Sequence, residues 1–203
     1  RHMAGTRDPL AAPHAWYVIT ELSTTDEGVA GALEDILGAA FEQDIIEDAA
    51  LAGSLEQGKA FMHLRLALSE VQGHEGGSIK DDVSVPVAQV PDFIAEASAV
   101  AMKLIPGSRP VPFGHLGDGN IHFNVSQPVG ADKAAFLARW KEVNAAVHEI
   151  VHKYHGSISA EHGIGQLKRE LLPGVKDPVA LDLMRAIKAT LDPKGILNPG
   201  KVL

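Results

Sequence analysis

The sequence predicts an α+β fold in which a mostly antiparallel sheet carries helices on one face. Two observations lead to this class. Short β-branched segments alternate with longer segments of helical periodicity, and residues 109–127 read as two strands around a glycine-rich turn. Because such a hairpin places consecutive strands antiparallel, it favours this sheet over a doubly wound parallel sheet, which is the weaker alternative.

The N-terminal half alternates predicted strands and helices. Residues 16–22 (WYVITEL) are β-branched and aromatic and predict a strand, and the acidic TTDEG behind them signals the start of a helix that runs through Ala39. The same pairing then repeats twice. It predicts strands at 45–48 and 78–85 and helices at 54–72 and 88–104, separated by the breakers GHEGGS and PGSRP.

The C-terminal half begins after the central hairpin with one long predicted helix over residues 132–154. Its buried stripe is expected to contain Phe136, Trp140, Val143, Val147, Val151 and Tyr154. A short strand at 157–161 and two terminal helices follow, before a tail rich in Pro and Gly.

Alternation along the strands gathers polar side chains on one face of the sheet. In residues 120–126, Ile121, Phe123 and Val125 alternate with Asn120, His122, Asn124 and Ser126. Residues 78–85 and 157–161 repeat the pattern, with Lys80, Asp82 and Ser84 and with Ser157, Ser159 and Glu161. A solvated face is the simplest explanation. A face that carries His, Asn, Lys and Glu also suits the floor of a site or a surface awaiting another domain.

The composition narrows the class of partner. The 203 residues include 18 Lys and Arg against 26 Asp and Glu, which gives a net charge of −8, and there is no cysteine. An acidic chain without a basic run argues against nucleic acid or an anionic membrane as main partner. Because cysteine is absent, histidines and carboxylates are the remaining candidate metal ligands. No segment has the roughly 18 to 20 apolar residues of a membrane span, so we expect a cytoplasmic protein. Residues 1–15 read as a tag remnant and linker, and residues 16–203 as the folded domain.

The densest signal for chemistry is the segment Gly114 to His122, GHLGDGNIH. Its three glycines permit a tight turn that brings His115 back alongside His122. Two imidazoles and one carboxylate make a divalent-metal site with positions left open for substrate. Asp118 and Glu161 are the candidate carboxylates, and Glu161 is preferred because it ends a polar strand face next to His162.

A rival metal motif lies in the long predicted helix, where His148 to His152 reads HEIVH and matches the pattern of zinc peptidases. A helical wheel places His148, His152 and His155 roughly 80° to 140° from the centre of the apolar stripe, on a flanking to outer face. We therefore interpret these histidines as a solvated face.

An anion site is suggested by Arg65 and Ser69, which are neighbours one turn apart on the predicted helix 54–72 beside its apolar stripe of Phe61, Leu64, Leu68 and Val71. An arginine fork suits a carboxylate, and Lys80 on the polar strand face would add a second positive charge. Taken alone, Arg65 is more often a residue at the rim of the core than a ligand.

Three segments in this order, HLGDGNIH, SAEHGIG and MRAIKATLDPKGILNPGK, resemble the C-terminal half of the FAD-linked 2-hydroxyacid dehydrogenases. The group includes D-lactate and D-2-hydroxyglutarate dehydrogenases and the glycolate oxidase flavin subunit. The resemblance runs from about Trp16 to the end, and it implies oxidation of a D-2-hydroxy acid to a 2-oxo acid. FAD would be held mainly by a separate FAD-binding domain that the 203 residues lack. An electron acceptor, which could draw the protein to a membrane, and a second copy in a homodimer are further expected partners.

The resemblance also implies roles for individual residues. His115, His122 and Glu161 would hold a divalent Zn or Mn ion, His162 would be the general base and Asn120 would orient the substrate. Substrate carboxylates would meet Arg65, Ser69 and Lys80. Two cations and a hydroxyl are more than a 2-hydroxy acid with only a methyl group beyond Cα requires, so we expect a dicarboxylate such as D-2-hydroxyglutarate ahead of D-lactate or glycolate. Asn198 would contact the cofactor. The surroundings of Arg65 depart from the family pattern, since MHLRL lacks the usual tryptophan and acidic residue.

Two other functions remain open from the residues alone. A metal-dependent hydrolase could use the same two histidines and glutamate with a bound water. A non-catalytic binding domain could use the polar face to dock a partner. Flavin bound to the longer protein would distinguish a redox enzyme from both alternatives. The flavin is sought there because this chain has no glycine-rich phosphate cradle between a strand and a helix.

Overall fold

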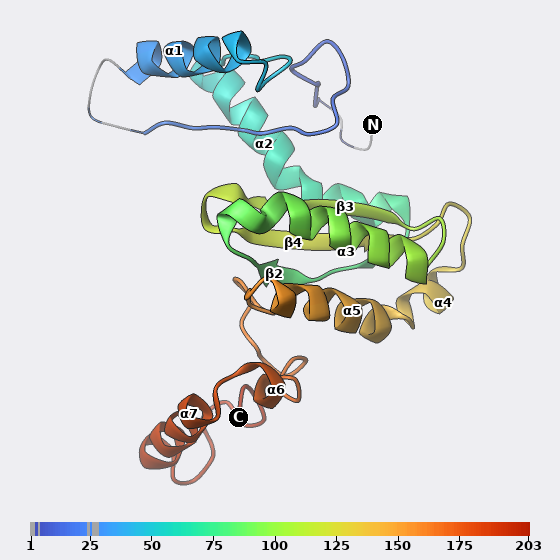
Figure 1. Ribbon diagram of the computed structural model, residues 1–203, viewed down its shortest axis with the longest axis vertical. Coiled ribbons are helices and arrows are strands. Elements are labelled where there is room, and N and C mark those ends of the chain that lie inside the picture. Colours follow the sequence, from blue (N-terminus) through green and yellow to red (C-terminus); the bar gives the residue numbers. More distant parts are fainter. Residues whose placement is uncertain (1–2, 4, 24, 26–28) are drawn as a thin grey trace. The chain divides into compact units, whose positions relative to one another are not determined.

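The structure, a computed structural model, describes residues 3, 5–23, 25 and 29–203. The chain divides into two units, residues 1–74 and 75–203 (Figure 1). Each unit is described by itself.

The first unit is helical. It contains α1 (Val29–Glu42) and α2 (Leu55–Val71), and Ser54 caps α2 by accepting a hydrogen bond from the backbone of Gln57 at 3.3 Å. Both helices were expected. The strands predicted at 16–22 and 45–48 are wrong, because no residue of this unit that the structure describes pairs as a strand. Trp16 and Val18 are 65% and 77% exposed, so these residues of high β propensity do not pack against a neighbouring strand.

The expected stripe on α2 is only partly buried. Phe61, Leu64 and Val71 are half-buried, whereas Leu68 is exposed. Beyond α2 a 3₁₀ turn, η1 (Gln72–Glu75), spans the boundary between the two units.

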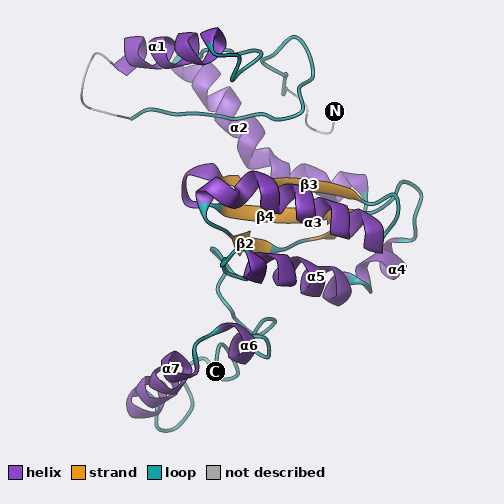
Figure 2. Ribbon diagram, in the orientation of Figure 1, coloured by secondary structure: helices purple, strands orange, loops and turns teal. Residues whose placement is uncertain are grey.

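The second unit contains a four-stranded antiparallel sheet (Figure 2). β4 (Asn120–Ser126) is central, with β3 (Arg109–His115) along one side and β1 (Ser78–Ile79) and β2 (Asp82–Ser84) along the other. The predicted strand 78–85 is therefore present as two short strands. Their register against β4 does not change across the interruption, since Ile79 opposes Val125 and Asp82 opposes His122. This sheet, with its helices, confirms the predicted α+β class.

Two helices cover the apolar face of the sheet. They are α3 (Val90–Leu104), which follows the 3₁₀ turn η2 (Val87–Gln89), and α5 (Trp140–Lys153). Phe93 of α3 meets Phe123 of β4 edge to face, with ring centroids 5.9 Å apart. The buried core draws on both helices and the strands, as the alternation in residues 120–126 predicts.

The long helix predicted at 132–154 is divided. α4 (Lys133–Leu137) is capped by Asp132, and a turn at Ala138 and Arg139 separates it from α5. The backbone N–H of Arg139 bonds the carbonyl of Phe136 at 3.1 Å, so the last turn of α4 tightens. Beyond the break, the predicted stripe is confirmed: Val143, Val147 and Val151 are at most 1% exposed.

The chain ends in a segment with two helices, α6 (Leu172–Val175) and α7 (Pro178–Leu191). Both terminal helices were expected, but the strand predicted at 157–161 is wrong. Only Ser157 pairs, through an isolated bridge to Ser84. The backbone N–H groups of residues 160–162 instead bond one side-chain carboxylate, described below. No described helix combines the length and the apolar character needed to cross a membrane.

Candidate active site

The hairpin of β3 and β4 gathers the first candidate residues. The connection is a 3₁₀ turn, η3 (Leu116–Asp118), closed by Gly119 in the left-handed conformation at φ 72°. In the resulting register His115 lies opposite Asn120, and His122 lies opposite Phe113. The turn therefore places His115 diagonal to His122 on the same face, as the glycine spacing predicts.

Glu161 reaches this hairpin from a distant part of the chain. Its carboxylate lies 3.1 Å from Nδ1 of His115 and 4.0 Å from Nε2 of His122. The Asn120 side-chain amide also donates a hydrogen bond to it. The Glu161 carboxylate thus lies near both imidazoles, with the Asn120 amide beside it.

His162 follows Glu161 and stacks on the same hairpin. Its ring lies 5.8 Å from the ring of His122, inclined by 28°, and its side chain is 69% exposed. An exposed imidazole beside the converging donors is accessible to a bound small molecule, which a general base requires.

Asp82 is the residue whose role the sequence did not reveal. Alternation placed it on the polar face of its strand but assigned it no function. One of its oxygens accepts hydrogen bonds from three backbone N–H groups, those of Ala160 at 3.1 Å and of Glu161 and His162 at 2.9 Å. The other lies 3.8 Å from Nδ1 of His122. Burial by itself raises the pKa of Asp82, but the N–H donors of His162 and Glu161, with the charges of His162 and Lys168, outweigh it and lower the pKa.

Two overlapping donor sets could hold a divalent ion. Asp82, His122 and His162 offer atoms within 4.8 Å of one another, but Asp82 is 3% exposed and its Oδ2 already accepts three N–H groups. His115 and Glu161 are 44% and 43% exposed, so an ion held by them and His122 keeps coordination positions open. The chemistry of this second set fits a catalytic divalent metal. Asp82 then lies behind His122, with one oxygen 3.8 Å from Nδ1 of the ring.

A comparison with known protein families finds one family that matches almost the whole chain. Residues 1–202 match the model described as FAD linked oxidases, C-terminal domain. The chain belongs to this family.

Several relatives of this FAD-linked oxidase C-terminal domain carry the same name, D-2-hydroxyglutarate dehydrogenase. The protein from Stutzerimonas stutzeri is 38% identical over 194 residues, which cover 96% of this chain and 42% of that protein. The one from Xanthomonas citri is 36% identical over 98% of this chain and 42% of its own length, and the mitochondrial one from Arabidopsis thaliana is 34% identical over 100% and 35%. The chain spans about two fifths of these curated relatives.

Among the described residues, the histidines of the helical HEIVH motif do not gather into a group of side chains close enough to hold a metal ion. His148 is buried, not solvated as expected, and its Nε2 lies 2.8 Å from a carboxylate oxygen of Asp81. His152 is exposed. A helical wheel could not reveal this pairing, because the partner of His148 comes from the sheet edge, 67 residues earlier in the chain.

The proposed substrate-carboxylate residues lie on both units. Arg65, half-buried, and Ser69, exposed, are one turn apart on α2, and Lys80 is exposed between β1 and β2. Asn198 lies exposed in the C-terminal loop with a left-handed backbone, φ 50°. The roles of these four residues rest on the resemblance.

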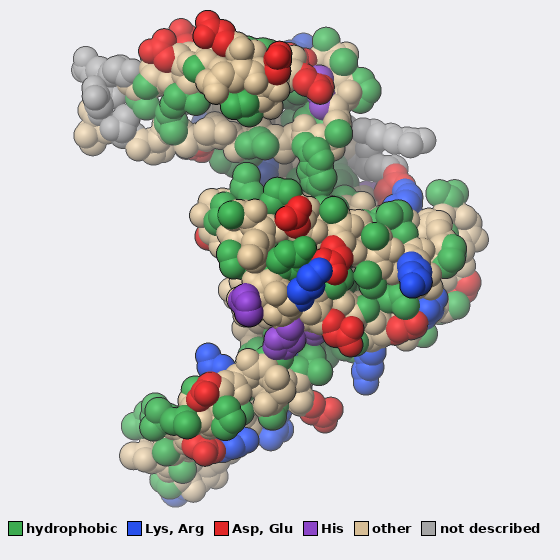
Figure 3. All heavy atoms as spheres, in the orientation of Figure 1, with side chains coloured by type: hydrophobic (Ala, Val, Ile, Leu, Met, Phe, Trp, Pro, Cys, Tyr) green, Lys and Arg blue, Asp and Glu red, His purple; other side chains and the backbone are tan. Residues whose placement is uncertain are grey.

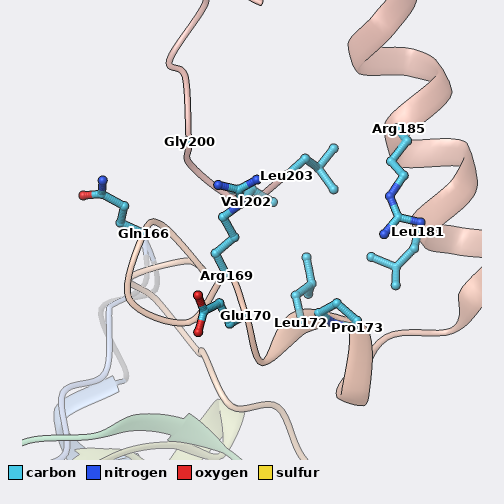
Figure 4. A pocket seen from close by; sticks show the side chains of 10 residues that line it. All are labelled: Gln166, Arg169, Glu170, Leu172, Pro173, Leu181, Arg185, Gly200, Val202 and Leu203. Carbon is cyan, nitrogen blue, oxygen red and sulfur yellow. The ribbon is translucent and has the colours of Figure 1, made fainter.

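The histidine cluster is partly exposed, since the side chains of His115, His122 and His162 are 44%, 19% and 69% exposed. Figure 3 shows histidine side chains on the visible surface of the sheet-bearing unit. A cavity of about 670 Å³ lies instead in the C-terminal segment of the FAD-linked oxidase domain, between the segment around Arg169 and α7 with Arg185 (Figure 4). Its lining contains none of the candidate site residues.

Proposed function

We propose that this domain forms the metal- and substrate-binding part of a flavin-dependent dehydrogenase that oxidises a D-2-hydroxy acid to a 2-oxo acid. The observation that supports it best is the position of the Glu161 carboxylate, 3.1 Å from Nδ1 of His115 and 4.0 Å from Nε2 of His122, with His162 stacked on His122. This donor set leaves room for a chelating ligand. A 2-hydroxy acid chelates through its hydroxyl and its C1 carboxylate.

Each residue of the site has its own role in this proposal. His115, His122 and Glu161 would hold the ion, Zn or Mn, and Asn120 would orient the substrate beside Glu161. A bound ion would lower the pKa of the substrate hydroxyl, and His162 would accept its proton. When bound, FAD supplies the acceptor for the hydride that leaves Cα. Asn198 would contact this cofactor, and an external electron acceptor would complete the cycle.

We propose a dicarboxylate such as D-2-hydroxyglutarate as substrate, ahead of D-lactate or glycolate. The ion accounts for the C1 end, so Arg65, Ser69 and Lys80 remain for a second carboxylate. The names of the relatives support the same choice. A homodimer of the longer protein is compatible with this role.

Metal analysis tests the site. Purified wild type should bind one equivalent of Zn or Mn, and His122→Ala should lose it because a first ligand is removed. His152→Ala is the matched control, since this exposed histidine belongs to the helical motif. Loss of metal in His152→Ala, with His122→Ala unaffected, would refute the proposed site.

Turnover tests the reaction in the longer protein that carries the FAD-binding domain. His162→Gln should lower kcat on D-2-hydroxyglutarate by roughly 100- to 10,000-fold, the usual range for loss of a general base, while metal content stays unchanged. Lys80→Ala should weaken turnover of the dicarboxylate far more than that of D-lactate. Equal losses on both substrates would assign Lys80 to the common carboxylate.

A further inference from the structure

The loop that carries Glu161 and His162 has no regular secondary structure to hold it. Residues 159–163 belong to no helix or strand, and only Ser157 bridges to β2. Two functional side chains thus stand on a segment that the sheet ladder does not fix. Other contacts must hold the backbone of this segment, because a displacement of a functional group by about 1 Å can lower a reaction rate on the order of 100-fold.

Asp82 meets this segment at each of three successive residues. One oxygen accepts from the N–H groups of Ala160, Glu161 and His162 at 2.9 to 3.1 Å. Consecutive N–H groups that converge on one anion form a nest, an arrangement that fixes backbone conformation. Asp82 is itself held in β2, opposite His122, and is 3% exposed.

The second oxygen of Asp82 faces the site. It lies 3.8 Å from Nδ1 of His122 and has no hydrogen-bond partner within the described part of the chain. One rigid carboxylate therefore touches a proposed metal ligand on the strand and the backbone of the loop that bears the other two functional groups. A group in this place fixes the distance between them.

Lys168, at the far end of the loop, also contacts Asp82 and its neighbour Asp81. Lys168, with its side chain 17% exposed, donates to the Asp81 carboxylate at 3.0 Å and to the backbone carbonyl of Asp82 at 3.2 Å. Its ammonium also donates to the carbonyl of Ile158. Residues 158–168 are thus clasped at both ends against Asp81 and Asp82.

We propose that Asp82 is a positioning residue that sets Glu161 and His162 against His122, with Lys168 as a brace for the same loop. The proposal rests on the proposed function, in which Glu161 binds the ion and His162 accepts a proton. Asp82 itself contacts neither the metal nor the substrate. It acts through the three N–H groups and the His122 ring.

The test compares metal affinity with thermal stability in Asp82→Ala, Asp82→Asn and Lys168→Met. Asp82→Ala should weaken Zn binding 10- to 100-fold, the range for loss of an outer-shell partner. Asp82→Asn, which keeps an oxygen acceptor, should recover part of that loss. In the longer protein, kcat should fall while KM for the hydroxy acid changes less than 3-fold.

Asp177→Ala is the matched control. This carboxylate also accepts from a backbone N–H, that of Ala180 at 3.1 Å, but at the start of α7. Its loss should lower Tm and leave Zn affinity unchanged. Zn affinity within 2-fold of wild type in Asp82→Ala would overturn the proposal. Should that variant fail to fold, unchanged affinity in both Asp82→Asn and Lys168→Met would overturn it.

Failure of the proposed function gives a different result. Glu161→Gln and His122→Ala would then bind Zn as tightly as wild type, whatever Asp82 does. Weakened binding in both ligand variants but not in the Asp82 and Lys168 variants would refute the positioning role alone.

Discussion

Replacement of Gly119 by alanine is expected to be among the most damaging single-methyl changes in the hairpin. Gly119 has φ 72°, and a Cβ added there would lie 1.9 Å from the backbone oxygen of Val85. The left-handed conformation costs an alanine about 1–2 kcal/mol. Backbone movement to relieve the clash would also break the hydrogen bond from the N–H of Val85 to the carbonyl of Gly119, 3.1 Å long. A buried group left unpaired costs roughly 1–3 kcal/mol more.

The sum, about 2–5 kcal/mol, corresponds to a Tm lower by roughly 4–20 °C for a chain of this size. Gly117→Ala is the matched control, because its added Cβ meets nothing within 4 Å and its backbone φ is not in the left-handed region. Thermal unfolding followed by circular dichroism measures both variants. Gly119→Ala should also weaken Zn binding, since Asn120 follows directly and donates to Glu161. Equal Tm shifts in the two variants would refute the steric argument.

Three further predictions concern the packing of the second unit. The Lys153 ammonium, aided by the Tyr154 hydroxyl, holds the pKa of Glu96 below its ordinary value of 4.5. A carboxyl group whose pKa is lowered in the folded state stabilises the fold at pH values above its unfolded-state pKa. The Tm difference between wild type and Glu96→Gln should therefore be full at pH 7 and vanish as the pH falls through the folded-state pKa. A difference that grows in acid would contradict this. Asp132→Ala removes the N-cap of α4, in which the Asp132 carboxylate accepts a 2.7 Å hydrogen bond from the N–H of Ala135. The free energy of unfolding measured in urea should fall by about 1 kcal/mol, and no change would mean that this cap does not stabilise the fold. Phe123→Ala should cost about 3–5 kcal/mol in the same assay, because Phe123 is 1% exposed, and a loss below 1 kcal/mol would contradict its place in the core.

The parts of the fold that sequence predicted well depend on local patterns. Alternation in residues 120–126 and the glycine turn before them specify the hairpin without reference to distant residues. The strand predicted at 16–22 has equally good local propensity but finds no partner. That at 157–161 loses its backbone donors to Asp82. Local propensity cannot register either event, because both depend on residues far away in the chain.

The candidate site shows the same division. His115 and His122 pair across the turn with residues five and nine positions away, Asn120 and Phe113, and the sequence predicts their proximity directly. Glu161 joins them as expected from the polar character of its segment. The contacts of Asp82 were missed, because three backbone donors leave no trace in residue types. The burial of His148 was missed too, since hydrophobic periodicity cannot reveal an acid that lies between β1 and β2.

Asp81 and Asp82 are adjacent in sequence but contact different parts of the chain. Asp81 meets His148 of α5 and the Lys168 ammonium, and Asp82 meets the loop of Glu161 and His162. Substitution of Asp82 therefore leaves the contact to α5 in place, whereas substitution of Asp81 removes the contacts to both His148 and Lys168. Insertion or deletion of a single residue within 78–85 would exchange the directions of the two side chains, turning the helix partner toward the loop and the loop partner toward the core. Length variation in this stretch should therefore be far less tolerated than substitution. Insertions should be accepted at Gly130, which is positioned in a turn with open space around it.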